Sequence, residues 1–359
     1  MIAAMSCQKS DMVSPSSSSQ SSVDLKITGP VSFTQTNLVA DVSEYSPKMI
    51  DPVLVNAWGL AFSDEGTPWV NATESGVSAV YSASGQKVIP AIGIPFNGEP
   101  GNPTGIMYNE TNDFIIPTTG DKSEFIFSTE NGTILAWATG RKATTVADRS
   151  GEEAVYKGLA IAQNGGSNFL YATDFKNAKV DVFDHEFKYI ETTGFVDPTL
   201  PAGYAPFNIR EINGQLYVTY AKQLGPDNED DEAGPGNGYV DIYTPNGDLV
   251  MRFASQGVLN SPWGIAQVPG HNAIMIGNFG DGKINVFGPD GKFMTSVKAE
   301  NGTDDLVIEG LWALIFAEND LPAVHSRLYF TAGPDEETHG VFGVLTPTVD
   351  DELTANVDQ

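Results

Sequence analysis

The chain has 359 residues, of which 41% are hydrophobic and 18% are charged, a balance typical of a packed globular protein. Its 46 Asp and Glu against 19 Lys and Arg give a formal net charge of -27, which argues against nucleic acid and anionic lipid surfaces as partners. The single cysteine, Cys7, excludes an intramolecular disulfide framework and a cysteine-based metal or redox site.

Residues 1–29 predict a leader ahead of the folded body. The stretch Ala4-Met5-Ser6-Cys7 resembles the lipobox of bacterial lipoproteins, and the serine-rich residues 14–22 are typical of a flexible tether. We therefore expect an exported protein: an outer-membrane lipoprotein anchored at Cys7, or a periplasmic or cell-surface protein. The alternative is an isolated cysteine in an unstructured leader. No run of 18 or more apolar residues occurs, so no membrane span is expected.

An apolar strand with the same opening recurs six times along the rest of the chain. Each copy combines a small residue, a proline or an aromatic residue with, in most copies, a glycine, as in Asn56-Ala57-Trp58-Gly59 and Ser261-Pro262-Trp263-Gly264. One marker residue per copy, just before the glycine-like position, gives a spacing of 46 to 56 residues. The markers are Trp58, Thr104, Lys157, Phe207, Trp263 and Trp312. A fixed period of this length indicates one supersecondary unit repeated along the chain.

The residues after each opening strand predict three further strands. A second strand ends in a polar pair, a third alternates apolar and polar residues, as in Lys179–Phe183, and turns such as Pro245-Asn246-Gly247-Asp248 lead into a fourth. Four antiparallel strands at this period form one blade, so the sequence predicts an all-β, six-bladed β-propeller over residues 30–348. The alternating N-terminal segment 33–41 is expected to close the last blade. Residues 349–359 form an acidic tail outside the body.

The repeat pattern resembles that of NHL-type propellers. Three segments are more closely similar to an uncharacterised family of exported bacterial propellers: Thr36–Asp41, Asn56–Gly59 and His339–Gly343. The resemblance covers almost the whole body and implies the propeller fold and export. It implies no activity, because that family has none that is agreed.

In a propeller the innermost strands begin on the same face as the loops between second and third strands, so one face of the ring can be mapped from sequence. The six markers, with Glu309 beside them, are candidate ligand-binding residues. Four of the six are aromatic. They predict either an aromatic platform for a flat or sugar-like ligand, with Lys157 as its cation, or bulky side chains that fill the channel.

Oxygen-bearing side chains follow four of the second strands on that face. They are Glu74, Glu130, Asp174 and Asn278, a candidate site for a hard cation such as Ca²⁺, although residues that bond turn amides would give the same pattern. The acidic insertion Asp227–Glu232 in blade four lies on the same face, either as a further calcium ligand set or as a solvated loop. His339, in the loop of blade six, and Lys157 are the candidate catalytic residues.

Two functions remain open from the sequence. The first is an exported binding module, expected to be a monomer, that presents its loop-rich face to a glycan, a small molecule, a peptide or a partner protein. The second is a metal-assisted lactonase, hydrolase or lyase. No cofactor follows with certainty, and Ca²⁺ is the one considered. The common nucleophile, zincin and phosphate-loop motifs are absent from the sequence. Whether the protein is an enzyme is left undecided.

Overall fold

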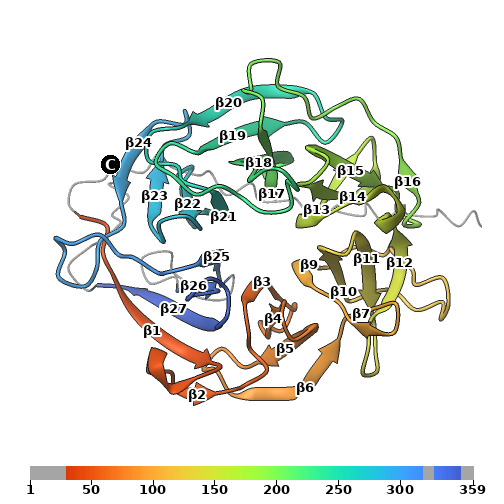
Figure 1. The fold of residues 1–359 in the computed structure, drawn as a ribbon, viewed down its shortest axis with the longest axis horizontal. Helices are drawn as coiled ribbons and strands as arrows, with labels where there is room; N and C mark the ends of the chain where they lie inside the picture. The colour runs from red at the N-terminus through yellow and green to blue at the C-terminus, as the bar shows by residue number, and fades with distance from the viewer. Residues whose placement is uncertain (1–29, 318–326, 349–359) are drawn as a thin grey trace, which may run out of the picture.

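The computed structural model describes residues 30–317 and 327–348, and within them it shows the predicted six-bladed β-propeller. Figure 1 shows the six sheets arranged in a ring around a central axis. Five blades contain four antiparallel strands in sequential order, and the sixth combines strands from both ends of the described body. Within residues 30–317 and 327–348, two short 3-10 helices, Ser43–Tyr45 and Ser150–Glu152, accompany the β-structure. The fold class predicted from the repeat is confirmed.

Five blades are continuous in sequence, and within each of them every strand pairs with the next. Blade one is β3(Ala57–Phe62), β4(Pro68–Ala72), β5(Val77–Tyr81) and β6(Lys87–Gly93); blade two is β9(Pro103–Tyr108), β10(Phe125–Thr129), β11(Thr133–Trp137) and β12(Thr144–Asp148); blade three is β13(Tyr156–Asn164), β14(Ser167–Asp174), β15(Lys179–Phe183) and β16(Tyr189–Ile190); blade four is β17(Tyr204–Ile212), β18(Gln215–Lys222), β19(Gly238–Tyr243) and β20(Leu249–Ser255); blade five is β21(Pro262–Gln267), β22(Ile274–Asn278), β23(Ile284–Phe287) and β24(Phe293–Ser296). A small hairpin, β7(Pro95–Phe96) with β8(Glu99–Pro100), joins blades one and two.

Blade six closes the ring with a strand from the other end of the chain. Its inner strands are β25(Leu311–Phe316), β26(Leu328–Ala332) and β27(Val341–Pro347), and β1(Phe33–Ala40) pairs antiparallel with β27. The short strand β2(Met49–Ile50) then adds to β1 in parallel. The prediction that the N-terminal segment completes the last blade is therefore confirmed, and the two ends of the described body are held in one sheet.

The recurring glycine is explained by how closely the innermost strands approach one another near the axis. A Cβ atom on Gly59 would lie 2.1 Å from the carbonyl oxygen of Thr104 in the next blade. On Gly158 it would lie 2.4 Å from the side chain of Asn208. Only a residue without a side chain fits at such distances, so the recurring glycine is required by the close contact between neighbouring blades.

The recurring hydroxyl at the end of the second strands connects each blade to the next. Thr73 donates a hydrogen bond to the carbonyl of Pro103 (2.8 Å), and Thr173 donates one to Phe207 (3.1 Å). Thr331 donates in the same way to Trp58, across the point where blade six meets blade one. These bonds satisfy buried backbone carbonyls. Between the blades pack clusters of buried aliphatic and aromatic residues, as expected for sheets that bury both faces.

Cys7, the serine-rich stretch and the acidic tail fall within residues 1–29 and 349–359, outside the described residues. A search of the described part of the chain for a helix long and apolar enough to cross a membrane finds none.

Candidate functional site

Four of the six marker residues pack against one another on the axis. Trp58 and Trp312 stack with their ring centroids 3.7 Å apart, and Trp263 meets them edge-on at 6.3 and 5.9 Å. Phe207 contacts Trp312 at 5.9 Å. None of the four side chains is more than 5% exposed. We call this group the tryptophan plug, because large buried rings fill the channel at the depth where the sequence placed an aromatic platform.

The predicted ring also includes the marker Thr104 and, beside the markers, Glu309, and both side chains bind other parts of the protein. Thr104 is fully buried, and its hydroxyl donates to the carbonyl of Tyr156 in the next blade (2.8 Å). Glu309 is exposed and accepts a hydrogen bond from the backbone of Asp335 (3.2 Å), which holds the loop of blade six. Both residues therefore link neighbouring segments of the face.

Lys157 is the charged member of the ring and is only 2% exposed. Its Nζ forms an ion pair with Glu130, lies 3.6 Å from Asp230 and sits 5.0 Å from the centre of the Trp58 ring. Burial alone would lower the pKa of this lysine, but the carboxylates of Glu130 and Asp230 outweigh burial and raise its pKa. Lys157 is therefore a fixed cation directly on the plug.

Glu337 joins this cluster from the loop of blade six. It accepts a hydrogen bond from Asn56 (2.7 Å), whose side-chain oxygen in turn accepts one from Trp312 (2.9 Å). Burial, together with the charge of Glu130, raises the pKa of Glu337 to about 7 against the opposing effect of Lys157. The sequence points to His339 as the candidate residue of this loop and does not identify Glu337. To identify Glu337 from sequence, one would need to know which side chain of the loop turns toward the axis.

The four predicted metal ligands take up two different environments. Asp174 accepts hydrogen bonds from Val155 and Asn177, and Asn278 donates hydrogen bonds to Val258 and Asp281, so both side chains connect segments of their own face. Glu74 and Glu130 are close enough for the Glu130 charge, after burial, to raise the pKa of Glu74. Among residues 30–317 and 327–348, no three His, Cys, Asp or Glu side chains form a group that could hold a metal ion.

Three lysines hold the acidic insertion of blade four. Glu229 pairs with Lys176 (2.9 Å), Asp230 with Lys157 (3.6 Å) and Glu232 with Lys222 (2.7 Å). Gly234 at the following turn donates its backbone N–H to Asn260 (2.7 Å). Three of the insertion's carboxylates are thus neutralised by protein cations, and the insertion reaches the axis at Lys157.

The side chain of His339 lies where β1 meets the loop before β27 in blade six. Its Nδ1 is 2.7 Å from Asp41, and Asp41 also accepts the backbone N–H of Gly340 (3.0 Å). The hydrogen bond with Asp41, against a smaller effect of burial, raises the pKa of His339. The imidazole therefore connects β1 to the loop before β27.

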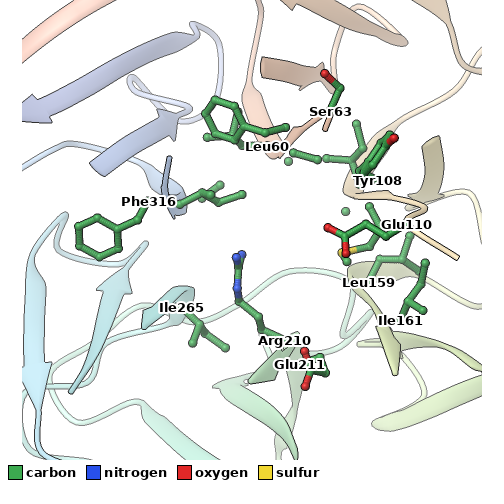
Figure 2. Close-up of a pocket in the computed structure, with 18 of the residues that line it drawn as sticks. Leu60, Ser63, Tyr108, Glu110, Leu159, Ile161, Arg210, Glu211, Ile265 and Phe316 are labelled. Atoms are coloured by element: carbon green, nitrogen blue, oxygen red, sulfur yellow. The ribbon is translucent and has the colours of Figure 1, made fainter. Parts of the chain in front are cut away.

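The opposite face of the ring contains a cavity of about 840 Å³ that the sequence reasoning missed. The ends of the six innermost strands line it, together with the turns that lead into the second strands, and Trp263 of the plug is among its walls. We call it the axial cavity. Figure 2 shows Leu60, Leu159, Ile161, Ile265 and Phe316 around it. These five apolar side chains form part of the lining, and polar residues form much of the rest.

Polar side chains line the cavity alongside the apolar ones, among them Ser63, Gln163 and Asn208. Figure 2 shows the guanidinium of Arg210 and the carboxylate of Glu110 inside the cavity, with the hydroxyl of Tyr108 at its edge. The indole Nε1 of Trp263 is buried and has no hydrogen-bond partner among the described residues. A concave apolar surface with a few polar groups that point inward is the usual form of a small-molecule site.

A sequence signal for the axial cavity did exist. In five of the six blades, the residue two positions after the marker lines the cavity: Leu60, Ile106, Leu159, Ile265 and Leu314. Side chains in a strand alternate between two sides, so this position faces the axis like the marker, but nearer the opposite face. Blade four departs from the pattern: Ile209 is buried in a core cluster between blades, and the next residue, Arg210, lines the cavity instead.

Comparisons with known proteins identify viral relatives. The chain is 33% identical over 313 residues to uncharacterized protein L690 of Acanthamoeba polyphaga mimivirus. This alignment covers 82% of this chain and 81% of that protein. It is 30% identical to uncharacterized protein R648 of the same virus, covering 82% of this chain and 76% of the relative. None of the protein-family models compared matches the chain.

Similar solved structures are propellers that share little sequence with this chain. Virginiamycin B lyase from Staphylococcus aureus, solved in an inactive form with quinupristin, aligns over 90% of this chain and 98% of its own with a TM-score of 0.54 and 13% identity. A protein of unknown function from Bacteroides thetaiotaomicron aligns over 91% of this chain and 73% of its own, with a TM-score of 0.55 and 11% identity. At these identities the likeness concerns the fold alone.

Proposed function

This chain belongs to the family that includes the mimivirus proteins L690 and R648, and from that premise we propose that it is a binding module that holds a small organic molecule in its axial cavity. The observation that carries the proposal is the cavity itself. Its volume of about 840 Å³ falls within the range of roughly 300–1,000 Å³ that is usual for ligand sites.

The two faces differ in what they offer to a ligand. At the loop face the aromatic rings are buried in the tryptophan plug, and Lys157 is already paired with Glu130. At the other face Leu60, Leu159 and Phe316 line the axial cavity, which is open among the residues that the structure describes. A ligand that enters there removes apolar surface from water without first displacing packed side chains, so burial of its apolar part provides the driving force.

The metal-assisted alternative requires several ligands gathered around one point, and among the described residues no three His, Cys, Asp or Glu side chains form such a group. Virginiamycin B lyase is an enzyme with the same fold, but a shared fold does not transfer an activity. Binding is therefore the function that the geometry supports best.

The test uses a neutral, apolar fluorescent probe, N-phenylnaphthylamine, titrated into the full chain. Ile161 lines the cavity, and Ile161→Trp fills part of it, so we expect the probe to bind the unmodified protein and to lose at least about tenfold in affinity to this variant. Ile190→Trp is the matched control, because Ile190 lies exposed on an outermost strand, β16. Equal affinity of the Ile161→Trp variant and its control would contradict the proposal, provided that both melt like the unmodified protein.

A further inference from the structure

A second cavity, of about 430 Å³, lies between blades one and two, and we call it the interblade cavity. Trp69 on β4 and Val88 on β6 line it from blade one, and Tyr108 and Phe125 line it from blade two. It adjoins the axial cavity, because Ser63 and Tyr108, which Figure 2 labels around that cavity, line both. Its volume falls within the range of roughly 300–1,000 Å³ that is usual for ligand sites.

Three aromatic side chains in this lining are in contact with one another. Phe125 stacks on Trp69 with ring centroids 4.0 Å apart, and Tyr108 lies 5.3 Å from Phe125. Val88, in the same lining, is 53% exposed, so it is an apolar side chain that a ligand would cover. Aromatic rings offer apolar contact together with an electron-rich face that attracts cations.

Three carboxylates accompany the aromatic rings in the interblade cavity: Asp64, Glu65 and Glu124. Burial, together with the charges of Asp64 and Glu124, raises the pKa of Tyr108, so both carboxylates lie near its hydroxyl. Within residues 30–317 and 327–348, no lysine, arginine or histidine lines this cavity or forms an ion pair with any of the three. Their negative charges therefore have no counterion in the described part of the chain.

Elsewhere in the molecule, an aromatic ring beside a carboxylate holds a cation of the protein itself. The guanidinium of Arg252 lies 4.7 Å from the centre of the Tyr239 ring and pairs with Asp241. Lys157 lies in the same way against the tryptophan plug and pairs with Glu130. The interblade cavity has the rings and the carboxylates, but no described side chain supplies the cation, so this charge is left for a ligand to supply.

The lining favours an organic cation over a metal ion. Among the described residues, no three His, Cys, Asp or Glu side chains form a group that could hold a metal, whereas aromatic walls suit a cation with an apolar body. Trp69 is only 4% exposed, and its indole N–H has no acceptor among the residues that the structure describes. Such a donor in a cavity wall favours a ligand that also carries an oxygen acceptor.

We propose that the interblade cavity binds a small organic ammonium ion that carries a hydroxyl group, in the class of amino alcohols with an apolar body. The carboxylates of Asp64 and Glu124 bind the ammonium group, the aromatic rings contact the apolar body, and the N–H of Trp69 donates to the hydroxyl oxygen. This inference does not depend on the proposed function, because Trp69 and Glu124 line the interblade cavity and not the axial cavity.

The experiment measures the affinity of three probes by isothermal titration calorimetry at pH 7. Phenylethanolamine carries both groups, phenylethylene glycol replaces the ammonium group by a hydroxyl, and phenethylamine lacks the hydroxyl. We expect phenylethanolamine to bind the unmodified protein at least about tenfold more tightly than the glycol and about threefold more tightly than phenethylamine.

Glu124→Lys places a cation of the protein in the cavity, so it should weaken phenylethanolamine at least about tenfold and leave the glycol unchanged. Glu99→Lys is the matched control, because Glu99 is exposed on β8, lines neither cavity and undergoes the same change of charge. We expect Glu99→Lys to alter the affinity for phenylethanolamine by less than about twofold. Glu124→Gln removes the charge without adding one and should weaken phenylethanolamine by about threefold.

Three results would overturn the inference. One is that phenylethanolamine does not bind, or binds the unmodified protein no more tightly than the glycol. Another is that Glu99→Lys weakens phenylethanolamine as much as Glu124→Lys, because overall charge and not the cavity would then decide affinity. Equal affinity of phenethylamine and phenylethanolamine would remove the hydroxyl, and with it the role of Trp69. Melting temperatures of the variants within a few degrees of the unmodified protein show that a loss of binding is not a loss of folding.

Discussion

The two ends of the central axis are built from the same six strands and yet have opposite character. At the loop face the strands begin with large or charged residues, and the plug, Lys157 and Glu337 close the channel. At the other face the ends of the same strands line an open cavity of about 840 Å³, with aliphatic residues from most blades and Arg210 from blade four. Because side chains alternate along a strand, residues two positions apart both face the axis. In most blades the first of them closes the channel and the second lines the cavity.

The two ends of the axis also differ in the surroundings of their charged side chains. Charges near the plug are paired with one another, as with Lys157 and Glu130 or Lys222 and Glu232, so they hold segments of the protein together. At the other end, Figure 2 shows the charged groups of Arg210 and Glu110 among the residues that line the axial cavity. The ion pairs at one end therefore hold the chain in place, whereas charged groups at the other end line a cavity.

The largest effect is expected at Gly59, which lies within β3 between the plug and the axial cavity, where neighbouring blades are in close contact. We expect Gly59→Ala to destabilise the fold by about 3 kcal/mol or more, because its Cβ would lie 2.1 Å from the Thr104 carbonyl, and neighbouring blades cannot separate without breaking the ring. Urea unfolding followed by tryptophan fluorescence measures the loss.

Gly151→Ala is the control for this change, because a Cβ at Gly151 meets nothing within 4 Å and the backbone there is not left-handed. We expect its midpoint to stay within about 0.5 kcal/mol of the unmodified protein. Comparable losses in the two variants would mean that contact between blades is not what requires the glycine.

The next largest effect concerns the closed end alone. Lys157→Met removes the buried cation and leaves Glu130, Asp230 and Glu337 facing one another, so we expect a loss of about 2–3 kcal/mol at pH 8. The loss should shrink near pH 5, where carboxyl groups take up protons. Chemical denaturation at both pH values measures it.

Lys188→Met is the matched change, because Lys188 pairs with Glu186 on the surface and both side chains are more than half exposed. An exposed pair contributes little, so we expect less than about 0.5 kcal/mol at either pH. If Lys157→Met is equally mild, the closed end does not depend on its central cation.

The fold could be predicted from sequence because its signals are local and repeated. The spacing of the markers, the glycine at Gly59 and Gly158 and the hydroxyl at Thr73 and Thr173 recur in several blades, so each copy strengthens the others. The strand that closes blade six was predictable for the same reason, since residues 33–41 carry the alternation that the last blade lacks.

The site could be predicted only in part. The sequence identified Lys157, Glu130 and the acidic insertion as neighbours on one face, but the pairing of that insertion with Lys176 and Lys222 depends on distant parts of the chain. The axial cavity was missed because its aliphatic lining looks like ordinary core. Which apolar residues face open space rather than packed neighbours depends on how far the ring opens, and no local pattern encodes that distance.

A smaller effect tests the charge balance of the closed end through pH. Burial raises the pKa of Glu337 to about 7, above the roughly 4.3 of an exposed glutamate, so the folded protein binds this proton more tightly than the unfolded chain. Stability from this group is therefore full below about pH 4 and falls as the pH rises toward 7. We expect Glu337→Gln to be more stable than the unmodified protein by about 1–2 kcal/mol at pH 8, with no gain at pH 4.

Glu336→Gln provides the comparison for this variant, because the neighbouring Glu336 is exposed. Its difference from the unmodified protein should not change between pH 4 and pH 8. A Glu337→Gln variant that is equally stable relative to the unmodified protein at both pH values would show that the carboxyl group is not held in a costly ionised form.

The smallest effect lies outside both ends of the axis, where His339 joins the closing strand β1 through Asp41. The raised pKa means that the protonated imidazole is favoured in the folded state, so its contribution is full below the unfolded value of about 6.5 and is lost as the pH rises through the folded pKa. We expect His339→Gln to lower stability by less than about 1 kcal/mol at pH 5.5 and by less still at pH 9. His185→Gln, at an exposed histidine, should show no such dependence in thermal melts. A loss that is the same at both pH values would mean that the imidazole contributes by packing rather than by charge, because only a charged partner of Asp41 can make the closure of the ring depend on protons.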